Sequence, residues 1–370
     1  MNSPHARFAR RPPSRRVSPL GRRLGTGLRR KIATGRGGTL WIALVAMLAV
    51  VLCTPAVAEV DEVRLVRQFG IHYLPLVVME HEKLIEKQAA TRGMPHLKVT
   101  WAQLSGGASV NDALLSGAVE YSAGGTGPLI VLWDKSKGGK GDVKAVAAVS
   151  DVPMTLLTRN PEVKSLKDFT DKDKIALPAV KTSMQAVTLQ MAAAKLWGDA
   201  QFERLDKLTV SMRHPDGAAT MLSGQGEIDA HFTAAPYDFI ELKNPAIHRV
   251  LDSYDVYGGP ATLIVLYCTR KFHDENPKVN ASVVAAMEEA DELIKADPKR
   301  AAEIYLAVTK EKTTVEDLVA MITNPKIAFR LAPSAIFPVA EFLHRTGRVK
   351  NKAASWKDLF FSSAHDLQGS

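Results

Sequence analysis

Short apolar runs alternate with longer amphipathic segments through the first part of the sequence. We predict strands in four of these runs, at residues 63–68, 98–103, 119–123 and 145–149. The intervening segments place apolar side chains at helical spacing, which predicts helices at 76–88, 110–116 and 128–134. This β-α-β-α-β-α-β order predicts an α/β fold with a largely parallel sheet.

The same alternation restarts at residue 154. It predicts strands at 154–158, 175–177, 208–212 and 228–232, an apolar run at 261–268, and helices at 183–197 and 215–223. Residues 280–361 are mostly helical in pattern, with Asp297-Pro298 and Asn324-Pro325 as helix boundaries. A series that restarts predicts two lobes: residues 59–149 begin lobe 1, 150–266 form lobe 2, and 267–370 complete lobe 1. The chain would cross between lobes near 149–152 and return near 259–267.

The N-terminal segment has the pattern of a secretory signal peptide, which we place at residues 1–58. Eleven Lys and Arg residues lie between Arg7 and Arg36, an apolar run follows from Thr39 to Cys53, and small residues end at Ala58. Four Arg pairs leave a twin-arginine signal open. An uncleaved anchor also stays open, although the run is shorter than the roughly 20 residues that span a bilayer. Leu52 before Cys53 disfavours a lipoprotein, and the start codon and cleavage site stay undetermined.

When the predicted signal peptide is left out, the charge and cysteine content of the remaining sequence exclude several classes of function. Subtracting its eleven basic residues from 48 leaves 37 Lys and Arg against 39 Asp and Glu, so no basic surplus indicates nucleic-acid binding. Cys268 is then the one remaining cysteine, which excludes an internal disulfide and a cysteine metal site. We predict that Cys268 is a buried small apolar residue. No metal, cofactor or catalytic residue is predicted, because no G-x-S-x-G or H-E-x-x-H motif is present.

Small-residue loops precede four of the predicted helices and predict an anion site. They lie at residues 69–76, 104–109, 123–128 and 180–184. Free N–H groups and the positive dipole end of a helix favour an anion, and Gly, Ser and Thr add close backbone approach and hydroxyl donors. Ordinary helix capping is the alternative for each loop.

Several single side chains are candidates with two interpretations each. Arg213 could hold an anionic head group with two hydrogen bonds, or be an exposed surface residue. His231 could contact a ligand, or be a satisfied core histidine. Tyr73 and Tyr237 could offer an aromatic face and a hydroxyl, or only pack. Asp151 could bind an amine on the ligand, or cap a turn.

The sequence resembles a known family through several segments in order: GIHYLPL at 70–76, GGASVNDALLSGAVEY at 106–121, VEYSAGGT at 119–126, SGQGEIDAHFTAAPY at 223–237 and SWKDLF at 355–360. Together they resemble the nitrate/sulfonate/taurine (NitT/TauT) family of solute-binding proteins of ABC importers. The resemblance implies an α/β, two-lobed type II periplasmic-binding-protein fold, with a hinge and a central ligand cleft. Glu120 stands where the family usually has Asp.

By position, the resemblance implies a cleft lined by loop residues that join Arg213 as candidate ligand contacts: Tyr73, Gly106, Gly107, Ala108, Gly125, Thr126, Ser150, Asp151, Thr182, Ser183, Met184, His231 and Thr233. It also implies a monomeric periplasmic protein that delivers its ligand to a permease powered by an ATPase subunit. The expected ligand is a small organic anion: a sulfonate, a taurine-like compound, nitrate or a carboxylate.

Two other functions stay open. A binding protein that reports its ligand to a membrane receptor would use the same lobes. The resemblance also extends to proteins that make a thiamine pyrimidine, but those carry a Cys-rich active-site segment that this sequence lacks.

Overall fold

The computed structural model describes residues 59–139 and 141–370. Within Val57–Ser370, the described residues belong to one compact unit. The predicted signal peptide lies outside the described residues. Within the described residues, no helix is both long and apolar enough to cross a bilayer.

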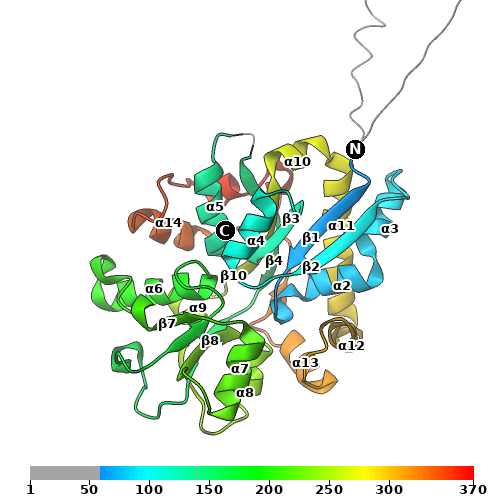
Figure 1. Cartoon of the computed structure of the whole chain (residues 1–370). Helices are drawn as coiled ribbons and strands as arrows, with labels where there is room; N and C mark the ends of the chain where they lie inside the picture. The colour runs from blue at the N-terminus through cyan, green and yellow to red at the C-terminus, as the bar shows by residue number, and fades with distance from the viewer. Residues whose placement is uncertain (1–58, 140) are drawn as a thin grey trace, which may run out of the picture. The chain divides into compact units, whose positions relative to one another are not determined.

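Two β-sheets form the centres of two lobes (Figure 1). The six-stranded sheet of lobe 1 has the order β11-β4-β10-β3-β1-β2, with β1 Glu62–Arg67, β2 Lys98–Gln103, β3 Tyr121–Gly125, β4 Val143–Asp151, β10 Thr262–Thr269 and β11 Ala328–Phe329. The five-stranded sheet of lobe 2 has the order β7-β6-β8-β5-β9, with β5 Met154–Thr158, β6 Ile175–Leu177, β7 Thr209–Ser211, β8 Ala230–Ala234 and β9 His248–Asp252.

Both sheets are mixed, which corrects the expectation of a largely parallel sheet. β1 pairs in parallel with β2 and β3, but β10 is antiparallel to β3 and β4. In lobe 2, β6 is parallel to β7 and β8, whereas β5 is antiparallel to β8 and β9. The strands on either side of the crossings pair antiparallel, because the chain leaves lobe 1 along β4 and returns along β10, and it enters lobe 2 along β5 and leaves it after β9.

The crossings lie close to where the apolar pattern restarts. β4 continues to Asp151 in the first sheet, and β5 begins at Met154 in the second. The return occurs after α9 (Ser253–Tyr257), and residues 262–266 already belong to β10 of lobe 1. The second sheet therefore spans Met154 to Asp252, a shorter stretch than the residues 150–266 expected for lobe 2.

Helices follow the strands much as the periodicity predicts. They are α2 Leu74–Glu82, α3 Leu84–Thr91, α4 Gly107–Leu115, α5 Thr126–Ser136, α6 Met184–Trp197, α7 His214–Ser223, α8 Tyr237–Glu241, α9, α10 Arg270–Glu275, α11 Pro277–Ala296, α12 Pro298–Thr309, α13 Val315–Ile322 and α14 Phe337–Arg345. Short 3₁₀ turns include η1 Ile71–Tyr73 and η5 Trp356–Leu359. The predicted helix 76–88 is broken at Lys83, whose φ of 53° is left-handed.

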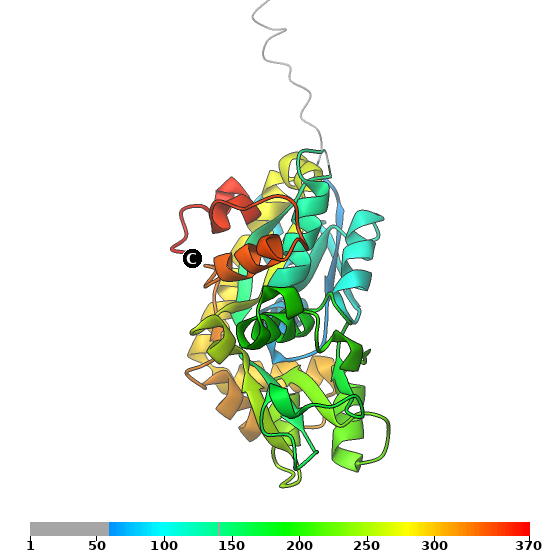
Figure 2. The same ribbon diagram turned by 90° about the vertical axis from the view of Figure 1, so that its left-hand side faces the viewer.

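The C-terminal helices complete lobe 1. α11 packs on α2 and α3, α12 packs on α2 and α13, and α14 packs on α5. The final segment returns to the six-stranded sheet, where Phe361 donates its N–H to the carbonyl of Ala145 at 2.9 Å (Figure 2, red). Cys268 is fully buried in β10, so its predicted role as a small core residue is confirmed.

Candidate functional site

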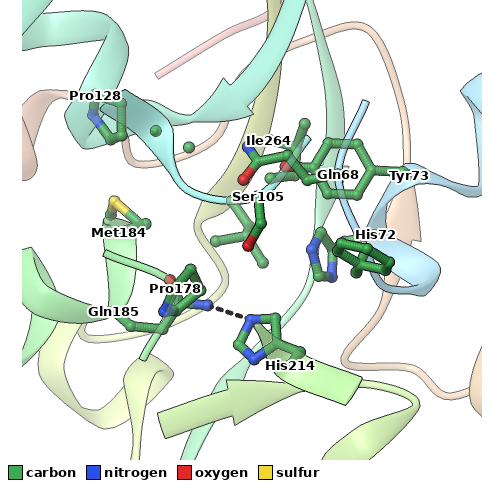
Figure 3. A pocket seen from close by; sticks show the side chains of 14 residues that line it. Gln68, His72, Tyr73, Ser105, Pro128, Pro178, Met184, Gln185, His214 and Ile264 are labelled. Carbon is green, nitrogen blue, oxygen red and sulfur yellow. Dashed lines mark hydrogen bonds between the residues drawn. The ribbon is translucent and has the colours of Figure 1, made fainter. Parts of the chain in front are cut away.

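A cavity lies where strands of both sheets end and helices begin. Its volume is about 30 Å³, which is roughly the room that one or two waters need. Lobe 1 and lobe 2 both line it, through Gln68, Phe69, His72, Tyr73, Ser105, Gly107, Gly125, Pro128, Leu263 and Ile264 of the first and Pro178, Met184, Gln185 and His214 of the second (Figure 3). Ligands of open α/β sheets bind beyond the carboxyl ends of strands, so this is the candidate binding site.

Four helices begin at this cavity, two from each lobe. α4 follows β2 and α5 follows β3, while α6 follows β6 and α7 follows β7. Their first residues or N-caps line the cavity: Gly107, Gly125, Met184 and His214. The positive ends of these helix dipoles therefore converge on one small space, which favours a negatively charged group there.

Glycines of lobe 1 let the two lobes touch. A Cβ on Gly125 would lie 2.9 Å from the Cβ of Met184, and one on Gly127 would lie 3.1 Å from Cγ2 of Val187. A Cβ on Gly106 would lie 3.1 Å from the carbonyl oxygen of Pro178. These small residues were expected to bring backbone close to a ligand. In the structure they also bring lobe 1 close to lobe 2.

The polar wall of lobe 1 is held by hydrogen bonds inside that lobe. The Gln68 side chain accepts from the N–H of Gly106 at 3.0 Å and donates to the carbonyl of Ala123 at 3.3 Å. The hydroxyl of Ser150 donates to the carbonyl of His72 at 2.8 Å. Within the described residues, Nδ1 of His72 is buried and has no hydrogen-bond partner.

The polar wall of lobe 2 continues into a buried chain of side chains. Nε2 of His214 lies 3.2 Å from Nε2 of Gln185, and Nδ1 of His214 lies 3.0 Å from Nε2 of His231. Nδ1 of His231 then lies 2.7 Å from Oε1 of Glu241, and both of these side chains are fully buried. The hydroxyl of Thr233 also contacts Nδ1 of His214, at 3.2 Å.

Burial sets the protonation of these groups. Loss of hydration lowers the pKa of His72 to about 3, with a further contribution from His214, and lowers the pKa of His231 to about 3. It also lowers the pKa of His214 well below its usual value, with His231 adding to the effect. The same loss of hydration raises the pKa of Glu241 to about 9. All three imidazoles are therefore neutral at pH 7.

The cavity wall has no formal charge. Among the described residues, none that lines it is Lys, Arg, Asp or Glu. A ligand here would meet amides, imidazoles, a hydroxyl, helix ends, and the apolar surfaces of Phe69, Leu263, Ile264 and Met184. No group of three or more His, Cys, Asp or Glu residues with metal-binding geometry is found in the part of the chain that the structure describes.

Four of the predicted site residues line the cavity: Tyr73, Gly107, Gly125 and Met184. Others lie directly behind it. Thr126 donates its hydroxyl to the carbonyl of Thr262 at 2.7 Å, and Ser183 caps α6 by accepting from the N–H of Ala186. Ser150, His231 and Thr233 hold the cavity histidines through the contacts described above.

The remaining predicted residues lie elsewhere. Gly106 caps α4 beside the cavity, and Ala108 and Thr182 line a separate surface hollow. Asp151 is buried at the end of β4, where it accepts from the hydroxyl of Thr262 and pairs with Arg330.

Arg213 is exposed and bonded to Asp216, with its Nε 2.7 Å from Oδ2, so the surface interpretation fits it better than the anion clamp. Its guanidinium also lies 5.9 Å from the ring centre of Phe69, a residue of the cavity wall.

Five polar residues of the cavity were not among the predicted contacts: Gln68, His72, Ser105, Gln185 and His214. Their signal was position in three cases: Gln68 directly follows β1, Gln185 is the second residue of α6, and His214 opens α7. His72 lies inside the segment GIHYLPL, and His214 directly follows the candidate Arg213. A rule that favoured neutral polar residues over Arg at these positions would have selected them.

Comparison with protein-family profiles shows which family the chain belongs to. The sequence profile described as the NMT1-like family matches residues 57–308, which is more than half of the chain. The chain belongs to the NMT1-like family. Among curated protein sequences, none matches this chain.

Solved structures similar to this NMT1-like chain confirm the fold. The alkanesulfonate-binding protein SsuA from Xanthomonas axonopodis pv. citri, bound to MOPS, has a TM-score of 0.63 and 16% identity, over 80% of this chain and 96% of that one. The periplasmic nitrate-binding protein NrtA from Synechocystis PCC 6803 has a TM-score of 0.59 and 14% identity, over 83% and 85%.

The periplasmic aliphatic sulphonate binding protein SsuA from Escherichia coli has a TM-score of 0.57 and 17% identity, over 82% of this chain and 93% of that one. The family profile and these matches confirm the NitT/TauT resemblance and the two-lobed periplasmic-binding-protein fold. At these identities the structural matches establish fold rather than ligand.

Proposed function

We propose that this chain is the solute-binding component of an ABC importer and captures a small organic anion between its two lobes. The observation that carries the proposal is the cavity itself. It lies at strand ends of both sheets, four helix N-termini meet there, and polar donors stand beside apolar side chains. The sulfonate- and nitrate-binding proteins of the same fold support an anionic ligand.

The proposed mechanism is closure of the lobes about two hinges. The hinges are Val152-Pro153 and residues 258–261, which join the sheets. A cavity of about 30 Å³ is too small for an organic anion, so entry requires the lobes to separate or the wall side chains to move. A ligand that contacts both lobes favours the closed form by its differential affinity. The closed form would then dock on a permease, and a separate ATPase subunit would drive release.

The proposed location is the periplasm, and the proposed state is a monomer. The basic, then apolar, then small-residue pattern of residues 1–58 supports export. The signalling alternative would use the same closure but a different membrane partner.

A ligand screen tests the proposal. Residues 57–370 form one compact unit and are the protein to use. Thermal unfolding would be followed with ethanesulfonate, taurine, nitrate, carboxylates and pyrimidines, and hits would be measured by calorimetry. A ligand at 100 times its Kd should stabilise the native state by about 2.7 kcal/mol. Binding of pyrimidines alone would contradict the proposal for an organic anion.

A pair of histidine variants locates the binding site. His214→Ala should weaken binding of the ligand found by about 30-fold, because it removes a buried hydrogen bond to a charged group worth about 2 kcal/mol. His248→Ala is the matched control, since His248 lies in β9 of the same lobe and bonds to the carbonyl of Val163. Equal losses in the two variants would place the ligand elsewhere.

A further inference from the structure

We propose that the buried chain Glu241–His231–His214 holds one proton that makes Nε2 of His214 a hydrogen-bond donor in the cleft, so that lobe 2 selects ligands with an anionic oxygen. This inference rests on the proposed function and specifies how lobe 2 recognises the head group. Two short contacts carry it: 2.7 Å from Oε1 of Glu241 to Nδ1 of His231, and 3.0 Å from Nε2 of His231 to Nδ1 of His214.

The chain can be polarised in only two ways. A neutral imidazole has one N–H donor and one acceptor nitrogen, so each contact fixes the hydrogen of the next. If the Glu241 carboxyl donates to Nδ1 of His231, then Nε2–H of His231 donates to Nδ1 of His214. The remaining hydrogen of His214 then lies on Nε2, at the cavity. If Glu241 is a carboxylate and His231 is neutral, every hydrogen reverses and Nε2 of His214 becomes an acceptor.

Packing favours the first polarity at neutral pH. Glu241 and His231 are both fully buried. Within the described residues, Oε2 of Glu241 is buried and has no hydrogen-bond partner, which would be costly for a carboxylate. Burial raises the pKa of Glu241 to about 9 and lowers that of His231 to about 3, so one proton stays with the pair between these values. A transfer of this proton from Glu241 to His231 leaves the same hydrogen on His214.

The local geometry holds the chain in place. His214 opens α7, and its ring lies almost parallel to that of Tyr237, with ring centres 5.6 Å apart. A Cβ on Gly217, one turn further along α7, would lie 2.8 Å from Nε2 of His231, so glycine there leaves room for the ring. The hydroxyl of Thr233 can donate or accept at Nδ1 of His214 and fits either polarity.

At the cavity end of this hydrogen-bond chain, the partner of His214 can match either polarity. Gln185 places its amide nitrogen, a donor, 3.2 Å from Nε2 of His214, so the first polarity requires this amide to be turned over, with its oxygen toward the ring. An anionic ligand oxygen would take the hydrogen of Nε2 directly. Across the cavity stands His72 of lobe 1, whose buried Nδ1 has no partner among the described residues (Figure 3). A ligand between the two rings could therefore satisfy a nitrogen of each lobe.

The other titratable groups near the Glu241–His231–His214 hydrogen-bond chain are as follows. Asp238, on the same helix as Glu241, has a pKa raised to about 7 by burial, against the hydroxyl of Thr155 that bonds to it. Arg249 of β9 acts on Asp238. Tyr237 bonds to Glu311. From lobe 1, the facing group is the neutral His72. Of these groups, Asp238 must be controlled for in a pH experiment.

The test reads the imidazole hydrogens directly and needs no ligand. Residues 57–370 would be labelled with ¹⁵N-histidine, and signals assigned by single His→Gln substitutions. At pH 7 we expect a pyrrole-type Nε2 on His214, and at pH 10 a change to a pyridine-type Nε2. In Glu241→Gln this change should be lost, because Gln does not titrate. In the matched control Asp238→Asn, the other buried acid of α8 is removed and the change should remain.

A pyridine-type Nε2 on His214 at pH 7 would overturn the proposal, and so would an unaltered change in Glu241→Gln. If Glu241→Gln does not fold, the wild-type spectrum at pH 7 still decides. The affinity for ethanesulfonate, if it binds, should fall at least tenfold from pH 7 to pH 10. A failed ligand screen with the expected His214 signal would count against the proposed function alone.

Discussion

The two walls of the cleft differ in what stands behind them. In lobe 1, the polar cavity residue Gln68 is fixed by two hydrogen bonds to backbone groups, and Gly107 and Gly125 are among the residues that line the cavity. In lobe 2, the cavity residue His214 leads through His231 to a buried carboxyl. Lobe 1 therefore presents a wall set by backbone shape, whereas lobe 2 presents one whose hydrogen-bond polarity depends on a proton.

The two walls should therefore contribute differently to ligand selection: lobe 1 to the fit of size and shape, and lobe 2 to recognition of charge. A wall made of backbone and fixed amides can select size and outline at any pH. In the other wall, the donor His214 is linked through His231 to the carboxyl of Glu241. Such a wall can exclude an anionic ligand when that carboxyl ionises. The cavity itself carries no formal charge among the described residues, so any pH dependence of binding should trace to lobe 2.

The largest expected effect is on stability, in Glu241→Gln. The folded pKa of Glu241, about 9, lies above its unfolded value of 4.5, so its contribution to stability is complete below pH 4.5 and is lost as pH rises toward 9. Gln has no such loss. The free energy of unfolding of the variant, relative to wild type, should therefore rise by about 4 kcal/mol between pH 5 and pH 8. Urea unfolding at both pH values measures it.

The lobe 1 counterpart is Gln68→Met, which removes two hydrogen bonds of a group that does not titrate. Its destabilisation should be about 1 to 2 kcal/mol and equal at pH 5 and pH 8. The comparison of the two walls would fail if Gln68→Met showed the pH slope, or if Glu241→Gln did not.

The next effect tests the shape of lobe 1, in Gly125→Ala. The new Cβ would meet the Cβ of Met184 across the lobes at 2.9 Å, so full closure should be prevented. We expect the affinity for the ligand to fall about tenfold or more, in line with overpacking costs of about 1–3 kcal/mol, while thermal stability without ligand changes little.

Its neighbour provides the control. A Cβ on Gly124 would lie 2.9 Å from the hydroxyl of Tyr267, inside lobe 1. Gly124→Ala should therefore lower the midpoint of thermal unfolding and affect affinity less than Gly125→Ala. The opposite ranking would show that the glycines serve the interior of the lobe rather than its closure.

Much of the fold follows from periodicity. The strands at 98–103, 154–158 and 175–177 have the predicted bounds; the last two are short, mostly apolar, buried runs, whereas KVTWAQ at 98–103 alternates polar and apolar residues. The mixed direction of the sheets was not predictable in this way. Strand direction depends on which edge the chain enters after crossing between lobes, and β10 has the same apolar pattern whichever way it runs.

The site was harder to predict than the fold. Loop glycines were found because they precede helices, and Gly107 and Gly125 do line the cavity. Arg213 was preferred to His214 because a guanidinium is the stronger anion ligand in isolation. The structure places His214 inside and Arg213 outside, since α7 starts between them. His231 and Glu241 are ten residues apart and lie in different elements, β8 and α8, so no local sequence pattern predicts their contact.

The smallest effect concerns a contact between the lobes far from the cavity. Nζ of Lys243, after α8, lies 2.6 Å from Oδ2 of Asp317 in α13, and the two side chains are 60% and 30% exposed. An ion pair of this exposure contributes about 0.2–1 kcal/mol, so Lys243→Gln should weaken ligand affinity no more than about fivefold. Because salt screens exposed charges, the difference should vanish in 0.5 M NaCl. Calorimetry at low and high salt measures it, and a large, salt-independent loss would mean that this edge takes part in closure by more than charge.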